Sequence, residues 1–178
     1  MTASNGEKYT RVSIALHWVL AIALILQLGV GVWMGDIPKG NPARAYYFNL
    51  HKSFGIVLFA LIVLRVWWRR GHPAPLLPAA FIGWQRTLAV ASHHLLYACM
   101  VVMPISGFVG SNFTKYGVKF FGLQVGPWGW EDKGIYAVFN GIHEICGNLF
   151  IAIVALHVVA ALKHLIVDRD GIFERMLP

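Results

Sequence analysis

The stretch NGIHEICGNLFIAIVALHVVAALKH, residues 140–164, decides how the chain is interpreted because it places two histidines in an otherwise apolar run. His143 and His157 are fourteen residues apart. On an α-helix this spacing corresponds to about 21 Å along the axis and almost four whole turns, so both imidazoles leave by nearly the same face. An imidazole buried among apolar groups without a partner is costly. We therefore interpret the two histidines as ligands held at two depths of one helix.

The composition indicates an integral membrane protein. Of the 178 residues, 57% are hydrophobic and only 13% are charged, which lies outside the usual range of soluble domains. Lys and Arg outnumber Asp and Glu by 15 to 8. In so apolar a chain this basic excess is typical of contacts with lipid headgroups and of membrane topology. We expect membrane lipid as a partner and no binding of nucleic acid.

Four segments are long enough to cross a bilayer, which takes about 20 helical residues. We expect these spans at residues 13–34, 49–68, 88–110 and 136–167. The sequence therefore predicts an all-α fold, an integral membrane four-helix bundle that forms a single domain over residues 1–178.

The links between the spans are predicted from their glycines, prolines and aromatic residues. Residues 35–48 and 69–86 are rich in Gly or Pro, which is typical of loops. The longest link, residues 111–135, carries Trp128 and Trp130 among glycines. We expect this link to lie at the membrane interface, where tryptophan is favoured.

The distribution of Lys and Arg predicts the orientation of the bundle. If the termini share a side with the link after the second span, that side holds nine bases: Lys8, Arg11, Arg65, Arg69, Arg70, Arg86, Lys163, Arg169 and Arg175. The other side holds six: Lys39, Arg44, Lys52, Lys115, Lys119 and Lys133. The positive-inside rule then places both termini in the cytoplasm.

With this topology, histidines of different spans fall into two pairs at matching depths. His17 and His157 lie in the cytoplasmic half, whereas His51 and His143 lie near the outer ends of their helices. A planar cofactor with an open axial position on each face needs two imidazoles from different helices. We therefore expect two haems stacked across the membrane. A small residue, with room for a macrocycle beside it, follows each histidine by four positions: Ala21, Gly55, Gly147 and Ala161.

Two other classes of protein fit the pattern less well. Zinc needs a compact tetrahedral cluster, whereas these pairs are about 21 Å apart. A proton or cation transporter normally carries carboxylates inside the membrane, and the spans contain almost none.

The remaining histidines and the arginines leave alternatives open. His93 and His94 stay outside the ligand set, although one of them could bind a propionate, serve a quinone pocket or replace a ligand. His164, beside Lys163, could deliver protons to a quinone or anchor the helix at the interface. We expect His72 to be solvated. Arginines and lysines near the haems could contact lipid phosphates or haem propionates: Arg65, Arg69 and Arg70 inside, and Arg44, Lys52 and Lys119 outside.

The chain resembles the bacterial cytochrome b561 family, which groups with the cytochrome b subunits of hydrogenases and formate dehydrogenases. The similarity covers nearly the whole chain. It rests on SIALHW around His17, NLHKSFGI around His51, HHLLY with His93, and IHEICGNLFIAIVALH with its fourteen-residue histidine spacing. The resemblance implies two haem b groups in a bacterial inner membrane, the cytoplasmic one ligated by His17 and His157 and the periplasmic one by His51 and His143.

The resemblance also implies a reaction. Stand-alone members of the family oxidise superoxide at the periplasmic face and reduce ubiquinone, so we expect a superoxide:ubiquinone oxidoreductase. A basic outer rim of Lys52, Lys115, Lys119 and Lys133 would attract a small anion, although Glu131 and Asp132 in the same region oppose that attraction.

The electron donor and the quinone site are open to more than one interpretation. The chain could instead be a cytochrome b subunit that passes electrons between a partner dehydrogenase and the quinone pool. A quinone or proton site is expected near the cytoplasmic haem, with His93, Lys163 and His164 as its candidates.

Overall fold

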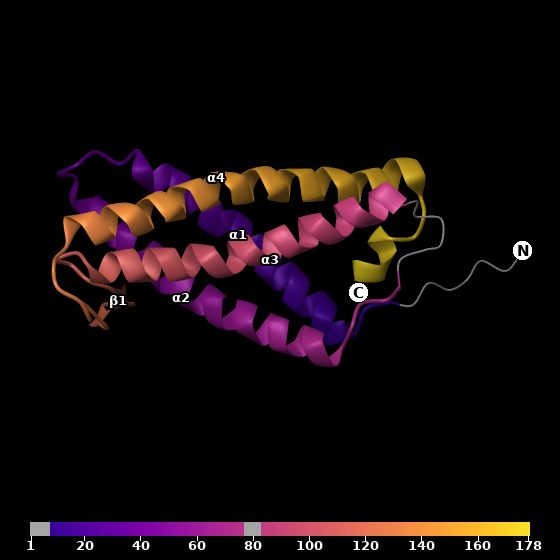
Figure 1. The fold of residues 1–178 in the computed structure, drawn as a ribbon, viewed down its shortest axis with the longest axis horizontal. Helices are drawn as coiled ribbons and strands as arrows, with labels where there is room; N and C mark the ends of the chain where they lie inside the picture. The colour runs from indigo at the N-terminus through magenta and orange to yellow at the C-terminus, as the bar shows by residue number, and fades with distance from the viewer. Residues whose placement is uncertain (1–7, 77–82) are drawn as a thin grey trace, which may run out of the picture.

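The computed structural model describes residues 8–76 and 83–178 and consists mainly of four long helices. These are α1 (Arg11–Gly35), α2 (Pro42–Gly71), α3 (Gly83–Asn112) and α4 (Lys133–Lys163). They run side by side along one elongated bundle (Figure 1). Each is long and apolar enough to cross a membrane. The expected all-α, four-helix membrane fold is confirmed.

The first described residues and the C-terminus lie at one end of the bundle (Figure 1), which we call the terminal end. After α4 the chain continues as a π-helix, η1 (His164–Asp168), and a short 3-10 helix, η2 (Phe173–Met176). The backbone N–H of Tyr9 donates to the Arg175 carbonyl at 3.3 Å. The indole N–H of Trp18 donates to the Met176 carbonyl at 2.7 Å. The C-terminal segment is therefore fixed against the start of α1.

The opposite end carries a two-stranded antiparallel hairpin, and we call it the hairpin end. Strands β1 (Lys119–Phe120) and β2 (Leu123–Gln124) pair with Lys119 opposite Gln124. Buried Ser53 of α2, only 1% exposed, joins this hairpin to the bundle. Its hydroxyl donates to the Asn49 carbonyl at 2.8 Å and accepts from the Phe121 N–H at 2.9 Å. The link after α3 is thus a folded cap, and its hairpin is a feature that the sequence did not predict.

Residues 42–48, which we expected in a loop, form the first turns of α2. Pro42 opens the helix, where its missing N–H and fixed φ are well tolerated. The Asn41 side chain caps the helix by accepting from the Ala43 N–H at 2.9 Å. Arg44 reaches back to the end of α1 and donates to the Gly35 carbonyl at 3.3 Å. The glycines and prolines therefore mark a short turn and a helix start.

The expected loop at 69–86 is also shorter than predicted. Helix α2 continues to Gly71, and α3 already begins at Gly83. Residues 77–82 of that loop lie outside the described residues.

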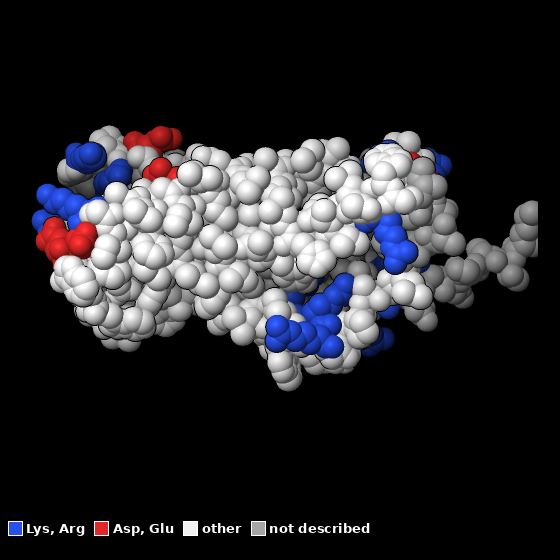
Figure 2. All heavy atoms as spheres, viewed as in Figure 1, with Lys and Arg blue, Asp and Glu red and all other residues white. Residues whose placement is uncertain are grey.

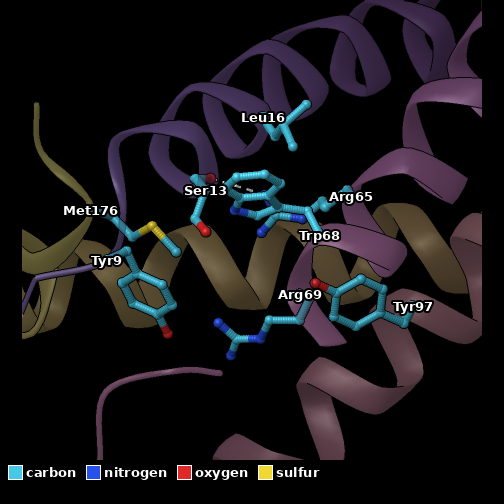
Figure 3. Close-up of a pocket in the computed structure, with 8 residues that line it drawn as sticks. All are labelled: Tyr9, Ser13, Leu16, Arg65, Trp68, Arg69, Tyr97 and Met176. Carbon is cyan, nitrogen blue, oxygen red and sulfur yellow. Dashed lines mark hydrogen bonds between the residues drawn. The ribbon is translucent and has the colours of Figure 1, made fainter. Parts of the chain in front are cut away.

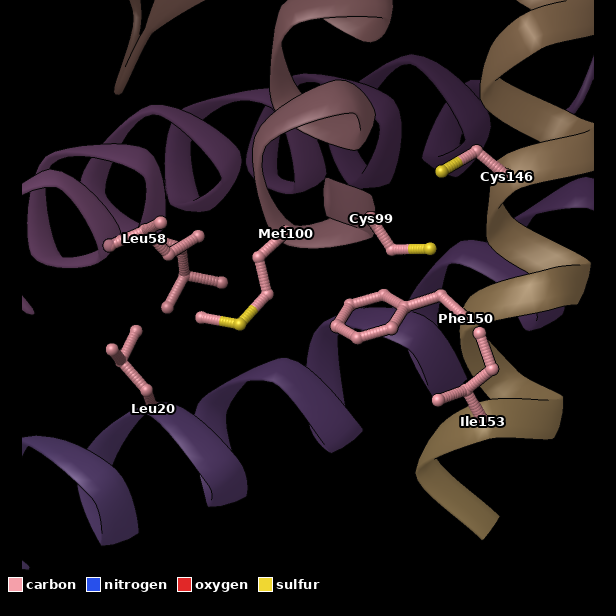
Figure 4. Close-up of a cluster of buried hydrophobic side chains, with 8 residues drawn as sticks. Leu20, Leu58, Cys99, Met100, Cys146, Phe150 and Ile153 are labelled. Atoms are coloured by element: carbon pink, nitrogen blue, oxygen red, sulfur yellow. The ribbon is translucent and has the colours of Figure 1, made fainter. Parts of the chain in front are cut away.

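The buried core is a cluster of side chains from all four helices (Figure 4). It consists of Leu20, Leu58, Ile62, Cys99, Met100, Cys146, Phe150 and Ile153. Phe150 is 2% exposed and stands seven residues from each of His143 and His157. Outside this core many large apolar side chains are exposed, and the visible face is a broad uncharged band with charges towards its ends (Figure 2). Such a surface suits contact with lipid.

The hydrogen bonds of Ser53 predict the stability of the hairpin cap. In Ser53→Ala the Phe121 N–H loses its partner, and we expect the free energy of unfolding in detergent to fall by about 1–3 kcal/mol. Limited proteolysis should then cut the cap more readily. Ser92→Ala is the matched control, because among the described residues the Ser92 hydroxyl bonds only within its own helix, to the Ala89 carbonyl. We expect that control to change the unfolding free energy by less than about 0.5 kcal/mol. Equal unfolding free energies for the two variants would show that the Ser53 hydrogen bonds do not stabilise the hairpin cap.

Candidate functional site

The structure brings four histidines together as two pairs, one towards each end of the bundle. His17 of α1 faces His157 of α4, with 6.4 Å between ring centroids and 69° between ring planes. His51 of α2 faces His143 of α4, with 6.3 Å and 83°. All four side chains are half-buried. These are the pairs that the sequence predicted, and α4 contributes to both.

The spacing within each pair suits a metal held between two imidazoles. A bond between imidazole nitrogen and a metal is about 2 Å long. Two rings that bind one metal from opposite sides therefore have nitrogens about 4 Å apart. No hydrogen bond joins the two rings of either pair in the described part of the chain. The centroid distances of 6.3 and 6.4 Å thus leave space between the rings of each pair for a haem iron.

The His143 imidazole is held in the protonation form that a metal ligand needs. Its Nδ1 lies 2.9 Å from the Met103 carbonyl oxygen. A carbonyl can only accept, so Nδ1 carries the proton and Nε2 keeps its lone pair for a metal. A backbone carbonyl behind a ligating histidine is a usual way to fix its orientation.

His51 differs from its partner because its Nδ1 is buried without a hydrogen bond. A buried polar atom of this kind is costly unless a ligand or another group satisfies it. The backbone of His51 is well held, since the Gln27 amide donates to its carbonyl at 2.7 Å. An orphaned ring nitrogen in this pair is consistent with a site that a bound group completes.

His17 fits a metal only after one neighbour moves. The Arg65 guanidinium lies 3.3 Å from Nδ1 of His17. Since a guanidinium can only donate, this contact places the proton of the neutral ring on Nε2. Ligation through Nε2 would move that proton to Nδ1, and Arg65 would have to turn towards another acceptor. A haem propionate is such an acceptor.

A cavity opens beside this arginine at the terminal end (Figure 3). It encloses about 230 Å³, including its opening. Its lining combines guanidinium groups, aromatic rings and a hydroxyl: Tyr9, Ser13, Leu16, Arg65, Trp68, Arg69, Tyr97 and Met176. The Arg69 guanidinium stands over the Tyr9 ring at 5.2 Å. The guanidinium groups of this lining offer hydrogen-bond donors to an anionic group next to the His17 level.

His93 adds a third imidazole to the pair at the terminal end. Its ring lies 5.4 Å from that of His157, at 86°. Its Nδ1 lies 2.6 Å from the Ala89 carbonyl oxygen and therefore carries the proton, so Nε2 can accept one. His94 makes the corresponding bond to the Val90 carbonyl at 2.8 Å. Being one residue further on, His94 points about 100° away around the helix.

Two of the candidates for the quinone or proton site, Lys163 and His164, contact acidic residues at the end of α4. Lys163 forms an ion pair with Asp168. His164 Nδ1 lies 2.7 Å from an Asp170 carboxylate oxygen and 3.4 Å from one of Asp168. His164 also follows His157 by seven residues, about 10 Å along the axis. His93, the third candidate, is in contact with the paired histidine His157.

One expectation about a single residue is corrected. His72, expected to be solvated, is half-buried and stacks on Trp68 with centroids 3.9 Å apart. Arg44, one of the candidates for a lipid phosphate or a propionate, donates to carbonyls at the end of α1 and covers the Phe48 ring at 4.6 Å. An added Cβ at Gly147 would make ordinary van der Waals contact with the Met103 methyl group at 3.4 Å.

The glycines that face the imidazoles are residues that the sequence reasoning missed. An added Cβ on Gly31 would lie 3.2 Å from Cε1 of His51, and one on Gly107 would lie 3.0 Å from Cε1 of His143. Each glycine belongs to a helix other than that of its histidine. A spacing rule within one helix could not have found them.

The basic rim at the hairpin end is mixed in charge. Lys115, Lys119 and Lys133 are exposed, whereas Lys52 is half-buried and donates to the Gly117 carbonyl at 3.1 Å. Asp132 caps α4, and the N–H of Ile135 lowers the pKa of its carboxyl, with help from the N–H of Gly134. This carboxylate therefore stays ionised at neutral pH and reduces the attraction of the rim for anions.

Comparison with known proteins identifies the family. The family model for prokaryotic cytochrome b561 matches residues 8–178. Cytochrome b561 homolog 2 of Escherichia coli K12 is 31% identical over 175 residues, which cover 98% of this chain and 93% of that relative. Cytochrome b561 homolog 1 of the same organism is 25% identical over 97% of this chain and 98% of its own length. The probable superoxide oxidase CybB of Yersinia pestis is 24% identical over 97% of each chain. Members of the family are haem b proteins that transfer electrons in membranes. The chain belongs to the prokaryotic cytochrome b561 family and is a multi-pass bacterial membrane protein.

Proposed function

We propose that the chain holds two haem b groups and carries electrons from superoxide to ubiquinone across the bacterial inner membrane. The observation that carries this proposal is the pair of facing imidazoles towards each end of the bundle, 6.4 Å apart for His17 and His157 and 6.3 Å for His51 and His143. When bound, the haems would supply one-electron carriers whose potentials the protein can tune. The helix α4 holds one ligand of each.

The hairpin end would face the periplasm and receive superoxide. The excess of bases towards the terminal end supports this orientation. Exposed Lys115 and Lys119 would raise the encounter rate of a small anion. Two superoxide anions each give up one electron and leave as dioxygen, and ubiquinone takes the two electrons with two protons to become ubiquinol. The probable superoxide oxidase among the relatives supports this donor.

The terminal end would bind ubiquinone. Its cavity beside Arg65 offers aromatic and polar lining to a quinone ring. His93 stands beside His157 with Nε2 able to exchange a proton, and we assign it the role of proton donor to the reduced quinone. Lys163 and His164, with their acidic partners at the membrane surface, are a second candidate for bringing protons to this end.

A second function is favoured by the exposed aromatic residues of the hairpin end. Trp128 is 72% exposed and Trp130 is 69% exposed. Tryptophan is enriched where proteins dock and also at membrane interfaces. The alternative is therefore a cytochrome b subunit that receives electrons from a partner dehydrogenase seated on this surface and passes them to the quinone pool.

The haem assignment predicts a haem b spectrum for the wild type and the loss of one haem when a paired histidine is removed. The purified protein should show a reduced-minus-oxidised haem b spectrum with two haems per chain. His157→Ala should remove about half of the haem and leave the centre between His51 and His143 spectrally intact, because only one pair loses an imidazole. His72→Ala, a histidine outside both pairs, is the control and should keep both haems. A colourless wild-type protein expressed with ample haem, or two haems retained in His157→Ala, would overturn the pairing.

The donor assignment predicts an electrostatic effect on rate. Replacing Lys115 and Lys119 with Gln should slow superoxide-driven haem reduction by about tenfold at low salt, because the rim loses positive charge. Added salt should slow the wild type more than the variant, since screening removes the same attraction. Stopped-flow spectroscopy measures both rates. Arg86→Gln, a neutralised base at the terminal end, is the control. If the wild-type rate does not depend on salt, the partner-dehydrogenase alternative is preferred.

The acceptor assignment predicts that two neighbouring histidines behave differently. His93→Gln should slow ubiquinone reduction by about tenfold or more, because the proton donor is lost. Its haem content and its superoxide-driven haem reduction should not change. His94→Gln is the matched control, since it alters the same helix turn on another face. Steady-state ubiquinol formation measures the effect, and equal rates for the two variants would remove His93 from the quinone site.

A further inference from the structure

The His143 imidazole is seated against one short segment of α3, residues 103–107. An ideal Cβ on Gly107 would lie 3.0 Å from both Cε1 and Nδ1 of His143. This distance is tighter than nine in ten real Cβ contacts, so the imidazole would have to move by a few tenths of an ångström in a densely packed site. The missing side chain of Gly107 therefore defines how closely the imidazole approaches α3.

Hydrogen bonds from the same segment fix the rotation of that ring. The Met103 carbonyl accepts from His143 Nδ1 at 2.9 Å and from the Ser106 hydroxyl at 3.0 Å. The Ser106 hydroxyl oxygen is also 3.4 Å from Nδ1. Ser106 is only 3% exposed, so water does not compete for these groups. The Met103 carbonyl, the Ser106 hydroxyl and the Cα of Gly107 together form the surface of α3 that contacts the His143 imidazole.

The arrangement is specific to the histidines of the hairpin end. Among the described glycines, Gly31 and Gly107 are the two whose added Cβ would meet an imidazole, and their partners are His51 and His143. Close packing of α3 on α4 occurs at a different glycine. An added Cβ on Gly110 would meet the Cβ of Phe139 at 3.1 Å. Packing between the helices and contact with the imidazole can thus be tested separately.

We propose that Gly107 and Ser106 are positioning residues for the haem at the hairpin end. Gly107 sets the distance of His143 from α3, and Ser106 with the Met103 carbonyl sets the orientation and the proton position of its ring. Neither residue is a ligand. The inference rests on the proposed function, which assigns His143 as an axial ligand. Residues behind a metal ligand commonly change metal retention by about tenfold or more when altered.

The test compares three alanine variants of α3 and α4. In Gly107→Ala the haem at the hairpin end should be retained about tenfold less well, or its low-spin resonance in low-temperature EPR should shift. The haem at the terminal end should keep its resonance and midpoint potential, which shows that the bundle is folded. Gly110→Ala controls for packing between the helices. Gly141→Ala controls for an added methyl group in open space, because nothing lies within 4 Å of its Cβ position.

The outcomes separate this inference from the proposed function. Two unchanged haem signals in Gly107→Ala, or an equal change in Gly110→Ala, would overturn the positioning role alone. A wild-type protein without a haem at the hairpin end would overturn both proposals. If Gly107→Ala does not accumulate, Ser106→Ala decides, and the midpoint potential of the haem at the hairpin end should shift while that of the other haem stays constant. An unchanged potential in that variant would contradict the proposal.

Discussion

The arrangement of this protein depends on the need to satisfy imidazoles within a membrane. A polar ring in hydrocarbon is stable only with a partner, and for the two facing rings of each pair the proposed haem iron would be that partner. Helix α4 meets this need twice, because His143 and His157 leave it on one face at two depths. The other helices are placed by that face. Helix α1 brings His17 to one end and α2 brings His51 to the other, so α4 links two centres that are otherwise separate.

The buried core between the two histidine pairs keeps water out of the middle of the bundle and would be the medium between the two centres. Phe150 lies midway between His143 and His157 on α4 and is packed with Met100 and Cys99 of α3. Dense packing of this kind excludes water from the middle of the bundle. The separation of the two pairs is set by α4 itself, because the rise per residue of a helix is constant. The same residues therefore provide the stability of the bundle and the medium that an electron would cross.

The sequence predicted the elements that depend on hydropathy and spacing, and it missed several close contacts between helices. Hydropathy predicted the four helices, the fourteen-residue spacing placed His143 and His157 on one face, and the depths derived from the charge bias paired them with His17 and His51. The glycines beside the imidazoles were missed because Gly31 and Gly107 lie close to histidines of other helices. The start of α2 was misplaced because Pro42 and Asn41 are typical of loops and equally of a helix cap. The role of Ser53 was also missed, because its hydroxyl bonds the N–H of Phe121, which is 68 residues away in the chain.

The two ends of the bundle differ in what surrounds the paired histidines, and the difference matches their proposed tasks. At the hairpin end, Gly31 and Gly107 lie close to the imidazoles, the Met103 carbonyl accepts from His143, and Ser53 joins the cap to α2. A donor that only passes an electron needs such a closely packed centre and no deep pocket. At the terminal end, Arg65 must turn away from His17 before a metal can bind there, and a cavity and a third imidazole lie beside it. An acceptor that is bulky and takes up protons requires that adaptability, so the asymmetry of the bundle favours ubiquinone at the terminal end.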